Sequence, residues 1–444
     1  MDDRKKILAW AFYDWGNSAF STTVIGVILQ TYILAIAPPD APLRGATLWS
    51  LGLVVSGLFS IFLTPILGAV ADYSNSKKKL WTIFMLLGSL STAAMFTITP
   101  EAYLWGVALS VLASIGFSGA FVFYNAFLPE IASEARRDQV SSLGFGLGYL
   151  GGGILLAANL VLLLFADQLG LTTGMASRIS LASAGAWWLI FSLPMWLTIH
   201  DAPRAAAAPK GVNYLTAGFK QLSATLKEVR ALPQVFRFLG AFLLYNSGIQ
   251  TVIGLSATFG QQELGLGQAT IAGVFLMVQF LAAVSAIAFG RLARRIGAKR
   301  AIVLSLIIWI VVVVSAYLFV YQAWQFWALG AGVALVLGGS QALSRSMYAQ
   351  FVPVKQTAEL FSFYEISDKL SGPVGPLVFA VVNQLSGSVR LGILALIVFF
   401  ILGLVILLGV NVPSGMADAG RKTAFDEARA GNALLQPLSE GAGD

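Results

Sequence analysis

The chain of 444 residues is 57% hydrophobic and 11% charged, and its mean hydropathy is +0.79. Soluble domains carry about 25% charged residues, so this composition excludes a soluble protein of this size. The absence of Cys and the single His exclude a disulfide framework and a His or thiolate metal site. The net charge of +7 comes from basic residues in the polar segments between apolar ones. This distribution indicates that the basic residues face anionic lipids at the membrane surface and do not bind nucleic acid.

Twelve long apolar segments follow one another along the chain. A helix needs roughly 20 apolar residues to cross a bilayer, and it satisfies its own backbone polar groups in lipid. The alternation of apolar and polar residues that is typical of the strands of a membrane β-barrel is absent. We therefore expect an all-α, polytopic membrane protein. The predicted spans are 9–36, 49–71, 80–98, 104–127, 141–165, 177–197, 236–259, 269–289, 301–321, 324–344, 358–385 and 389–410.

Basic residues gather in every second connection between these spans. With the N-terminus in the cytoplasm, the inward segments hold 24 of the 28 Lys and Arg, and Arg345 and Lys355 are assigned to the one after the tenth span. The outward connections hold Arg44, Arg178 and Arg390. This asymmetry predicts a multi-pass protein of a bacterial inner membrane, or an equivalent membrane, with both termini cytoplasmic.

The first span carries a charged residue among polar ones. Asp14, Asn17, Ser18 and Ser21 follow i, i+3, i+4, i+7 spacing, so they share one helix face. A charge inside a span is costly and often functional. Asp14 is therefore either a proton or substrate-ammonium site in a central cavity, or a structural group that caps or pairs near the inner interface.

Polar uncharged residues in later spans extend this set. Each of them is more often a helix–helix hydrogen-bonding group than a ligand contact, but together they outline a cavity. Glu130 and Arg137 are placed at the cytoplasmic surface, where they favour contacts between domains. The cavity candidates are Tyr124, Asn125, Asn246, Gln250, Gln279 and Gln341.

The eleventh span holds the densest group of charges. Tyr364, Glu365, Asp368 and Lys369 lie within it, and Glu365 and Lys369 can neutralise each other at i, i+4 spacing. That pairing would leave Asp368 unbalanced as a group that could titrate. Pro373 and Pro376 follow, and they predict a kink that serves either gating or packing.

The chain divides at its longest internal polar stretch. We predict an N-terminal six-helix bundle (1–198), a cytoplasmic linker with a basic amphipathic helix (199–235), a C-terminal six-helix bundle (236–411) and a disordered tail (412–444). Gly148 and Gly151 recur 224 positions later as Gly372 and Gly375, and Asn17-Ser18 recurs as Asn246-Ser247. Such repeats indicate two related halves with a substrate site between them.

Two loops carry a family signature. The segment from Gly68 through Asp72 to Lys79, and its counterpart from Gly290 through Arg294 to Arg300, resemble the loop 2–3 motif of the major facilitator superfamily. In that superfamily the motif latches the halves in the outward-open state. Arg294 stands where the family has a second acidic residue, so the second copy is expected to act only as an anchor to lipid headgroups.

Three further segments narrow the resemblance. They begin at Tyr13, Tyr124 and Gly144, and together they resemble the vacuolar-effluxer-like family. Its fungal members export amino acids from the vacuole. The resemblance implies a transporter and not an enzyme. We expect a monomer without cofactor or metal, and the charge asymmetry argues against a nucleic-acid partner.

The function expected from these features is secondary active transport of a small polar organic solute by alternating access. Protons are the expected coupling ion, and amino acids are favoured by the resemblance alone. A proton-independent facilitator or an exporter of amphiphilic compounds would use the same fold. A non-transporting membrane sensor is the alternative from another class, but the chain shows no folded soluble domain to support it.

Overall fold

The computed structural model describes residues 2–38, 52, 55–59, 66–68, 70–71, 76–201, 232–353 and 357–420, and this part of the chain is helical with short connections. Within it, nine helices are long and apolar enough to cross a membrane. Two further elements reach membrane length but carry more charge or an irregular turn: the first helical run and the helix that holds Glu365. The predicted amphipathic helix of the linker, Asp72 and most of the span predicted at 49–71 lie outside the described residues.

The first half of the chain builds one group of helices. Its elements begin at local caps: the Asp3 carboxylate accepts from the Lys5 amide at 2.9 Å, and the Thr172 hydroxyl accepts from the Met175 amide at 3.1 Å. The helices are α1 (Arg4–Ala19), η1 (Phe20–Ile28), α2 (Leu29–Ile36), α4 (Lys77–Ala94), α5 (Tyr103–Ile131), α6 (Arg137–Leu164) and α7 (Thr173–Thr198).

The second half builds the other group. The span predicted as one helix at 389–410 is two helices that meet at Leu396. The helices are α9 (Pro233–Gln262), α10 (Gln268–Ile296), α11 (Ala298–Leu318), α12 (Ala323–Gln350), α13 (Thr357–Ser386), α14 (Val389–Ala395) and α15 (Ile397–Leu408). Residues 412–420 form a further helix, so the start of the predicted disordered tail is ordered, with Gly415 against Phe351 and Gln234.

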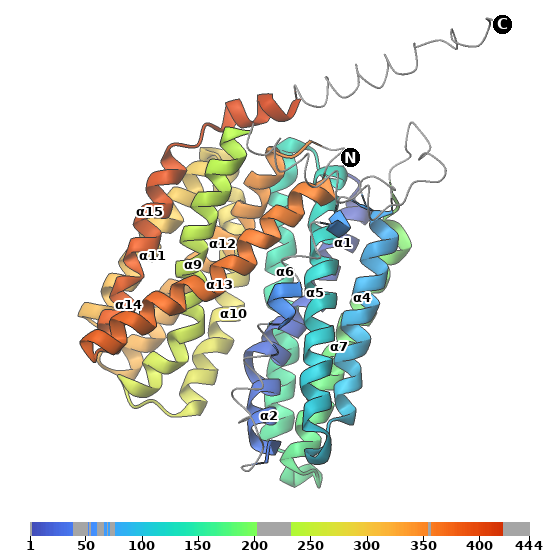
Figure 1. Cartoon of the computed structure of the whole chain (residues 1–444), viewed down its shortest axis with the longest axis vertical. Coiled ribbons are helices and arrows are strands. Elements are labelled where there is room, and N and C mark those ends of the chain that lie inside the picture. The colour runs from blue at the N-terminus through green and yellow to red at the C-terminus, as the bar shows by residue number, and fades with distance from the viewer. Residues whose placement is uncertain are drawn as a thin grey trace, which may run out of the picture.

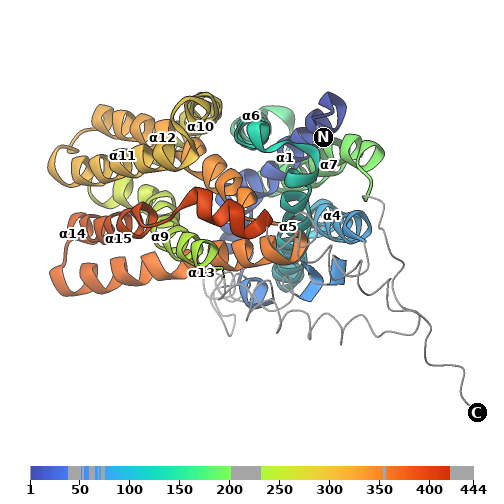
Figure 2. The same ribbon diagram turned by 90° about the horizontal axis from the view of Figure 1, so that it is seen from above.

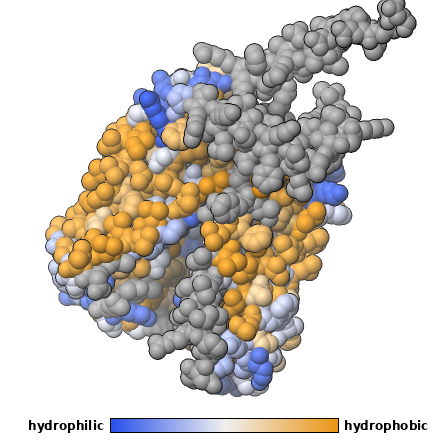
Figure 3. Space-filling view, viewed as in Figure 1, coloured by the Kyte–Doolittle hydropathy of each residue, from blue (hydrophilic) through white to orange (hydrophobic). Residues whose placement is uncertain are grey.

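The two groups of helices lie side by side (Figures 1 and 2). We call the end of the molecule where α1 begins the basic end, because Arg4, Lys77, Arg137, Arg294 and Lys299 lie there. Contacts between the groups run from this end along α6 with α10 and α12, and between α5 and α13. Toward the opposite end the groups diverge (Figure 1). Apolar side chains cover the flanks on the face shown in Figure 3, and polar ones gather at the two ends, as expected for a protein in a bilayer.

The helix that starts at Arg4 is not regular along its length. Residues Phe20–Ile28 form a π-helix, which the apolar pattern alone did not predict. The hydroxyls of Ser21 and Thr22 both donate to the Ser18 carbonyl, at 3.0 and 2.9 Å. Irregular helical backbone at membrane depth needs such partners, and π segments are frequent at functional sites.

Glycines let the equivalent helices of both halves approach closely. A Cβ on Gly151 of α6 would lie 2.3 Å from the Trp15 carbonyl oxygen of α1. A Cβ on Gly375 of α13 would lie 1.8 Å from Thr251 Oγ1 and 2.6 Å from the Ser247 carbonyl oxygen of α9. α13 continues through Pro373 and Pro376, and the repeat seen in the sequence thus corresponds to the same kind of helix crossing in each half.

Gly375→Ala is expected to destabilise the protein by about 1–3 kcal/mol, because the new methyl group must displace α9 backbone. Gly372→Ala is the matched control, since nothing lies within 4 Å of its Cβ position one turn earlier in the same helix. Thermal unfolding in detergent should show a lower midpoint for Gly375→Ala and an unchanged or higher one for Gly372→Ala. Equal midpoints for the two variants would contradict the close crossing.

Candidate functional site

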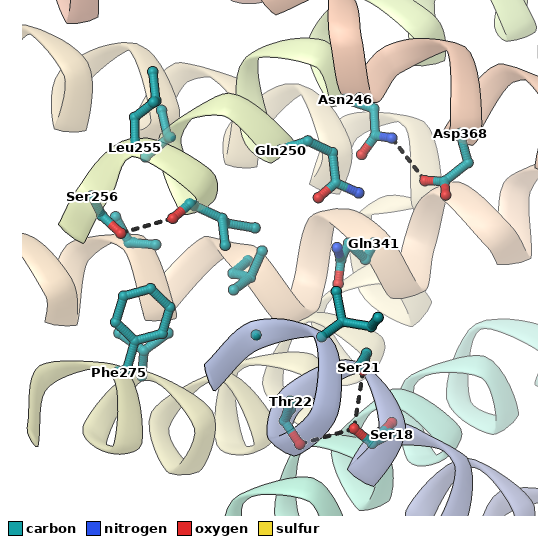
Figure 4. A pocket seen from close by; sticks show the side chains of 18 of the residues that line it. Ser18, Ser21, Thr22, Asn246, Gln250, Leu255, Ser256, Phe275, Gln341 and Asp368 are labelled. Carbon is teal, nitrogen blue, oxygen red and sulfur yellow. Dashed lines mark hydrogen bonds between the residues drawn. The ribbon is translucent and has the colours of Figure 1, made fainter. Parts of the chain in front are cut away.

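A large cavity lies between the two groups of helices. Its volume is about 1510 Å³, and most of its wall is apolar, with Phe117 and Phe145 on one side and Phe275 and Val278 on the other. Figure 4 shows Ser18, Ser21 and Thr22 from the first half below Gln250, Gln341, Asn246 and Asp368 from the second half. The sequence-predicted residues that line this cavity are Asp14, Asn17, Ser18, Ser21, Asn246, Gln250, Gln279, Gln341, Tyr364, Glu365, Asp368, Lys369, Pro373 and Pro376.

Asp14 is the centre of a polar cluster at the wall of the cavity. It is 3% exposed, and its carboxylate accepts from the Tyr124 hydroxyl at 3.1 Å and from the Ser18 hydroxyl at 3.4 Å. The guanidinium of Arg345 from α12 lies 3.5 Å away. Asp14 is therefore paired and also lines the cavity.

Arg345 corrects one sequence prediction. It is not in a cytoplasmic connection but inside α12, where its side chain is fully buried. Apolar and small residues continue for another turn past Arg345 to Tyr348 and Ala349, and this continuation was the available signal. The tenth span was predicted to end at residue 344, just before the charge of Arg345. Arg345 was therefore counted among the basic residues of the cytoplasmic connection that follows.

The surroundings of Arg345 come from the first half of the chain. Its Nε donates to Ser141 Oγ at 3.0 Å, its NH2 to the Ser141 carbonyl at 2.8 Å, and its NH1 to Asn125 Oδ1 at 3.2 Å. Its guanidinium lies 4.1, 4.9 and 5.4 Å from the ring centroids of Phe145, Trp10 and Tyr124. A site that combines a carboxylate with the faces of aromatic rings is a favourable environment for a planar cation such as guanidinium.

Two glycines of α6 make room for this cluster. A Cβ on Gly144 would meet Tyr124 Oη at 2.9 Å and the Arg345 NH2 at 3.0 Å. A Cβ on Gly148 would meet Ser18 Oγ at 2.6 Å and the Asp14 carboxylate at 3.2 Å. The glycine-rich segment of the predicted fifth span thus allows α6 to lie against the ion pair.

Asn125 links this cluster to a second carboxyl. It lies behind the cavity wall and is fully buried; its Oδ1 accepts from Arg345, and its Nδ2 donates to Glu365 Oε1 at 3.1 Å. Glu365 is 3% exposed. Within the described residues Glu365 and Lys369 form no direct ion pair, although the Lys369 charge still acts on the Glu365 carboxyl. Asp14, Arg345, Asn125 and Glu365 form one chain of contacts that crosses between the halves three times.

The remaining charges line the cavity in α13. Asp368 Oδ1 accepts from Asn246 Nδ2 at 2.9 Å, and Asn246 also contacts Ser371 Oγ at 2.6 Å. The Lys369 ammonium lies 5.8 Å from the ring centroid of Phe117 in the first half. An acid and a base thus face the same space from adjacent positions of one helix.

Asn17 has an amide with no partner. It is 1% exposed, it lines the cavity beside Ser18, and both its Oδ1 and its Nδ2 lack a hydrogen bond within the described part of the chain. A buried amide without partners is costly, so a bound polar group would be stabilising here. Gln250, Gln279 and Gln341 present further amides, and Tyr149 donates to the Gln341 oxygen across the halves.

Of the predicted gating residues, Pro373 and Pro376 line the cavity, whereas Glu130, Arg137, Gly290 and Arg294 lie at the basic end, near the interface between the halves. Lys77 pairs with Glu130 and donates to Thr357 Oγ1 of the second half at 2.9 Å. Arg137 donates to the Ala349 carbonyl at 3.2 Å, and a Cβ on Gly290 would meet Ser142 Cβ at 2.6 Å. Gln139, with its amide oxygen turned toward Arg294, lies 3.0 Å from that guanidinium. Gly68 is buried, and Asp72 lies outside the described residues.

The sequence of the chain matches one family over most of its length. The family described as vacuole effluxer Atg22 like matches residues 48–420. The chain belongs to this family. It is therefore a multi-pass integral membrane transporter of the major facilitator type, and not an enzyme.

Relatives and solved structures agree with this membership. The chain is 35% identical over 403 residues to the uncharacterized MFS-type transporter YxiO of Bacillus subtilis, which covers 90% of this chain and 93% of that protein. Autophagy-related protein 22-1 of Aspergillus fumigatus is 24% identical over 81% of this chain and 74% of its own. FucP, crystallised in the outward conformation, superposes with a TM-score of 0.68 at 14% identity over 92% of this chain and 100% of its own. That likeness shows the major facilitator fold.

Proposed function

We propose that this family member moves a small polar organic solute across the membrane by alternating access between residues about 1–198 and 236–411. The observation that carries the proposal is the cavity, which lies between the two groups of helices and is shut at the basic end by contacts between the halves. Charged groups inside the membrane line it, and such groups mark substrate and ion pathways because placing them there is costly.

The basic end is the cytoplasmic side in this proposal. The positive-inside rule places Lys77, Arg137, Arg294 and their neighbours in the cytoplasm, with both termini. The described state is then open to the outside of a bacterial inner membrane, and FucP in its outward conformation has the same fold. Closing the opposite end and separating the basic end would expose the same cavity to the cytoplasm.

Amino acids are the proposed solute class. The cavity offers a carboxylate at Asp368 and an ammonium at Lys369, next to each other in α13, which suit the two charged groups of a zwitterion. The unpartnered amide of Asn17 lines the same cavity from the first half.

Protons are the proposed coupling ion. Asp14, Glu365 and Asp368 are carboxyl groups in the wall of a cavity that faces one side of the membrane at a time. Such groups can take up a proton on one side and release it on the other. The coupling is expected to need no metal or cofactor.

The apolar wall supports a second candidate. A cavity of about 1510 Å³ exceeds the 300–1,000 Å³ of ordinary small-molecule sites, and Phe117, Phe275 and Val278 could contact a large apolar group. An amphiphilic compound would then be the solute. It is distinguished from an amino acid by whether binding strengthens as an alkyl chain is lengthened on the same polar head.

Reconstituted proteoliposomes test the proposal. We expect an imposed pH gradient to drive accumulation of at least one radiolabelled amino acid, a protonophore to abolish that accumulation, and Asp14→Asn to abolish it as well. Accumulation that ignores the protonophore would contradict proton coupling. If no amino acid supports counterflow while alkylated amines do, the amino-acid assignment is wrong.

A further inference from the structure

Arg345 takes its hydrogen-bonding, ion-pair and ring partners from the opposite half of the chain. The Ser141 hydroxyl and carbonyl, the Asn125 oxygen and the Asp14 carboxylate all belong to the first half, while Arg345 belongs to α12 of the second. The three rings around it, Trp10, Tyr124 and Phe145, are also from the first half. Among the described residues, no hydrogen-bonding, ion-pair or ring partner of this guanidinium comes from its own half.

We propose that the first half contains a cage for a guanidinium or ammonium group, and that Arg345 fills this cage only while the basic end is closed. The cage is the set Asp14, Asn125, Ser141 and the rings of Trp10, Tyr124 and Phe145. Arg345 is then a positioning residue that locks the halves together at the floor of the cavity. The inference goes beyond the proposed function, and its test reads conformation and not transport, so the two can fail separately.

The charge balance explains why this contact works as a lock. A guanidinium in the membrane interior is stable only with anionic or aromatic partners, and Arg345 would lose all of the partners named above if α12 moved away from α1, α5 and α6. The lock is also exposed to the solute, because Asp14 and Phe145 line the cavity. A cationic group or a proton that reaches Asp14 competes directly with Arg345.

The other titratable groups around Asp14 are few. Tyr124 of α5 donates to it at 3.1 Å, and Tyr149 of α6 and Tyr13 of α1 lie within electrostatic reach. Glu365 of α13 is connected only through Asn125 and Arg345. Arg345 is thus the one cation among the described groups that faces Asp14. Removing Arg345 should therefore allow the halves to separate at the basic end.

A contrasting arginine provides the control. Arg390 of α14 is also largely buried, but its partners are Glu263, at 2.9 Å, and the carbonyls of Ala316, Tyr317 and Val320. All of these lie in the second half, at the opposite end. Arg390→Gln therefore removes a buried arginine without touching the interface between the halves.

The chain suits cysteine labelling because it contains no Cys of its own. Ser142→Cys reports on the basic end: Ser142 is 2% exposed, its hydroxyl has no partner in the described structure, and it faces Gly290 across the interface. Ser256→Cys reports on the open cavity near the other end of α9. Each reporter is combined with Arg345→Gln or Arg390→Gln, and the rate of maleimide modification is measured in detergent.

If Arg345 is the lock, Arg345→Gln should raise the labelling rate at Ser142→Cys roughly tenfold or more and lower it at Ser256→Cys, because the population shifts from one state to the other. Arg390→Gln should leave the ratio of the two rates unchanged. A protein that is merely destabilised would label faster at both positions. Rates that rise together in Arg345→Gln, or that do not change, would overturn the proposal.

Chemical rescue tests the cage itself. In Arg345→Ala, millimolar ethylguanidinium should raise the midpoint of thermal unfolding, because the free cation can refill the space between the three rings and Asp14. The same compound should have no effect when Asp14→Asn is added. An equal effect of ethylguanidinium with and without Asp14 would mean that the cage does not bind the cation, and the inference would be wrong.

Discussion

Asp14→Asn is expected to destabilise the protein by about 3–5 kcal/mol, because it leaves a buried guanidinium without its carboxylate. Asp14 is the one carboxylate within 4 Å of Arg345 in the described structure. The Asn side chain can still accept from Tyr124 and Ser18, so the loss comes mainly from the missing charge. The midpoint of thermal unfolding in detergent measures it.

The double variant makes this prediction specific. Arg345→Met alone leaves Asp14 buried without its cation, whereas Asp14→Asn with Arg345→Met removes both charges. The double variant should therefore be less destabilised than the sum of the two single variants, with a coupling energy of about 0.5–3 kcal/mol. Glu263→Gln is the matched control, because the Glu263–Arg390 pair is partly exposed and lies within one half. Strict additivity in the Asp14–Arg345 cycle would show that the two groups do not interact.

Glu365→Gln is expected to uncouple transport from the proton gradient while leaving solute exchange intact. Glu365 Oε1 accepts from Asn125, and a Gln oxygen can accept the same bond at the same place. The substitution thus keeps the contact between the halves and removes only the proton that the carboxyl group could carry. In proteoliposomes, counterflow should stay close to the wild-type rate, and accumulation driven by a pH gradient should fall to the equilibrium level.

The control for this experiment is a carboxyl group away from the cavity. Asp167→Asn changes an exposed residue in the short helix Asp167–Leu169 at the opposite end, and it should leave both counterflow and accumulation unchanged. If Glu365→Gln still accumulated solute against its gradient as the wild type does, Glu365 would not be the coupling carboxyl group. Loss of counterflow in the same variant would instead assign Glu365 to solute binding.

The sequence predicted much of the fold because the bilayer imposes simple rules. Long apolar segments had to become helices, and the face shared by Asp14, Asn17, Ser18 and Ser21 does line the cavity. The repeat from Gly151 to Gly375 marked equivalent helix crossings. These inferences needed only local spacing and the energy of burying polar groups in lipid.

The features that were missed depend on contacts between distant segments. Arg345 is stable inside the membrane only because Asp14, Asn125 and Ser141 from the other half surround it, and no local pattern around residue 345 contains them. The π-helix at Phe20–Ile28 likewise follows from packing and from hydroxyl groups that satisfy freed carbonyls. The count of basic residues predicted which side of the membrane each loop faces. It could not distinguish an arginine in a loop from an arginine buried inside a helix.

The central claim is that the two halves alternate between the described state and one that opens at the basic end. Distances between paired spin labels test it most directly, with one pair at the exposed positions Ala135 and Arg295 of the basic end and another at Leu169 and Ala323 of the opposite end. Under conditions that support transport, a fraction of molecules should show a longer distance at the basic end together with a shorter one at the opposite end. Distances that stay fixed at both ends while solute is exchanged, or that lengthen together, would contradict alternating access in this protein.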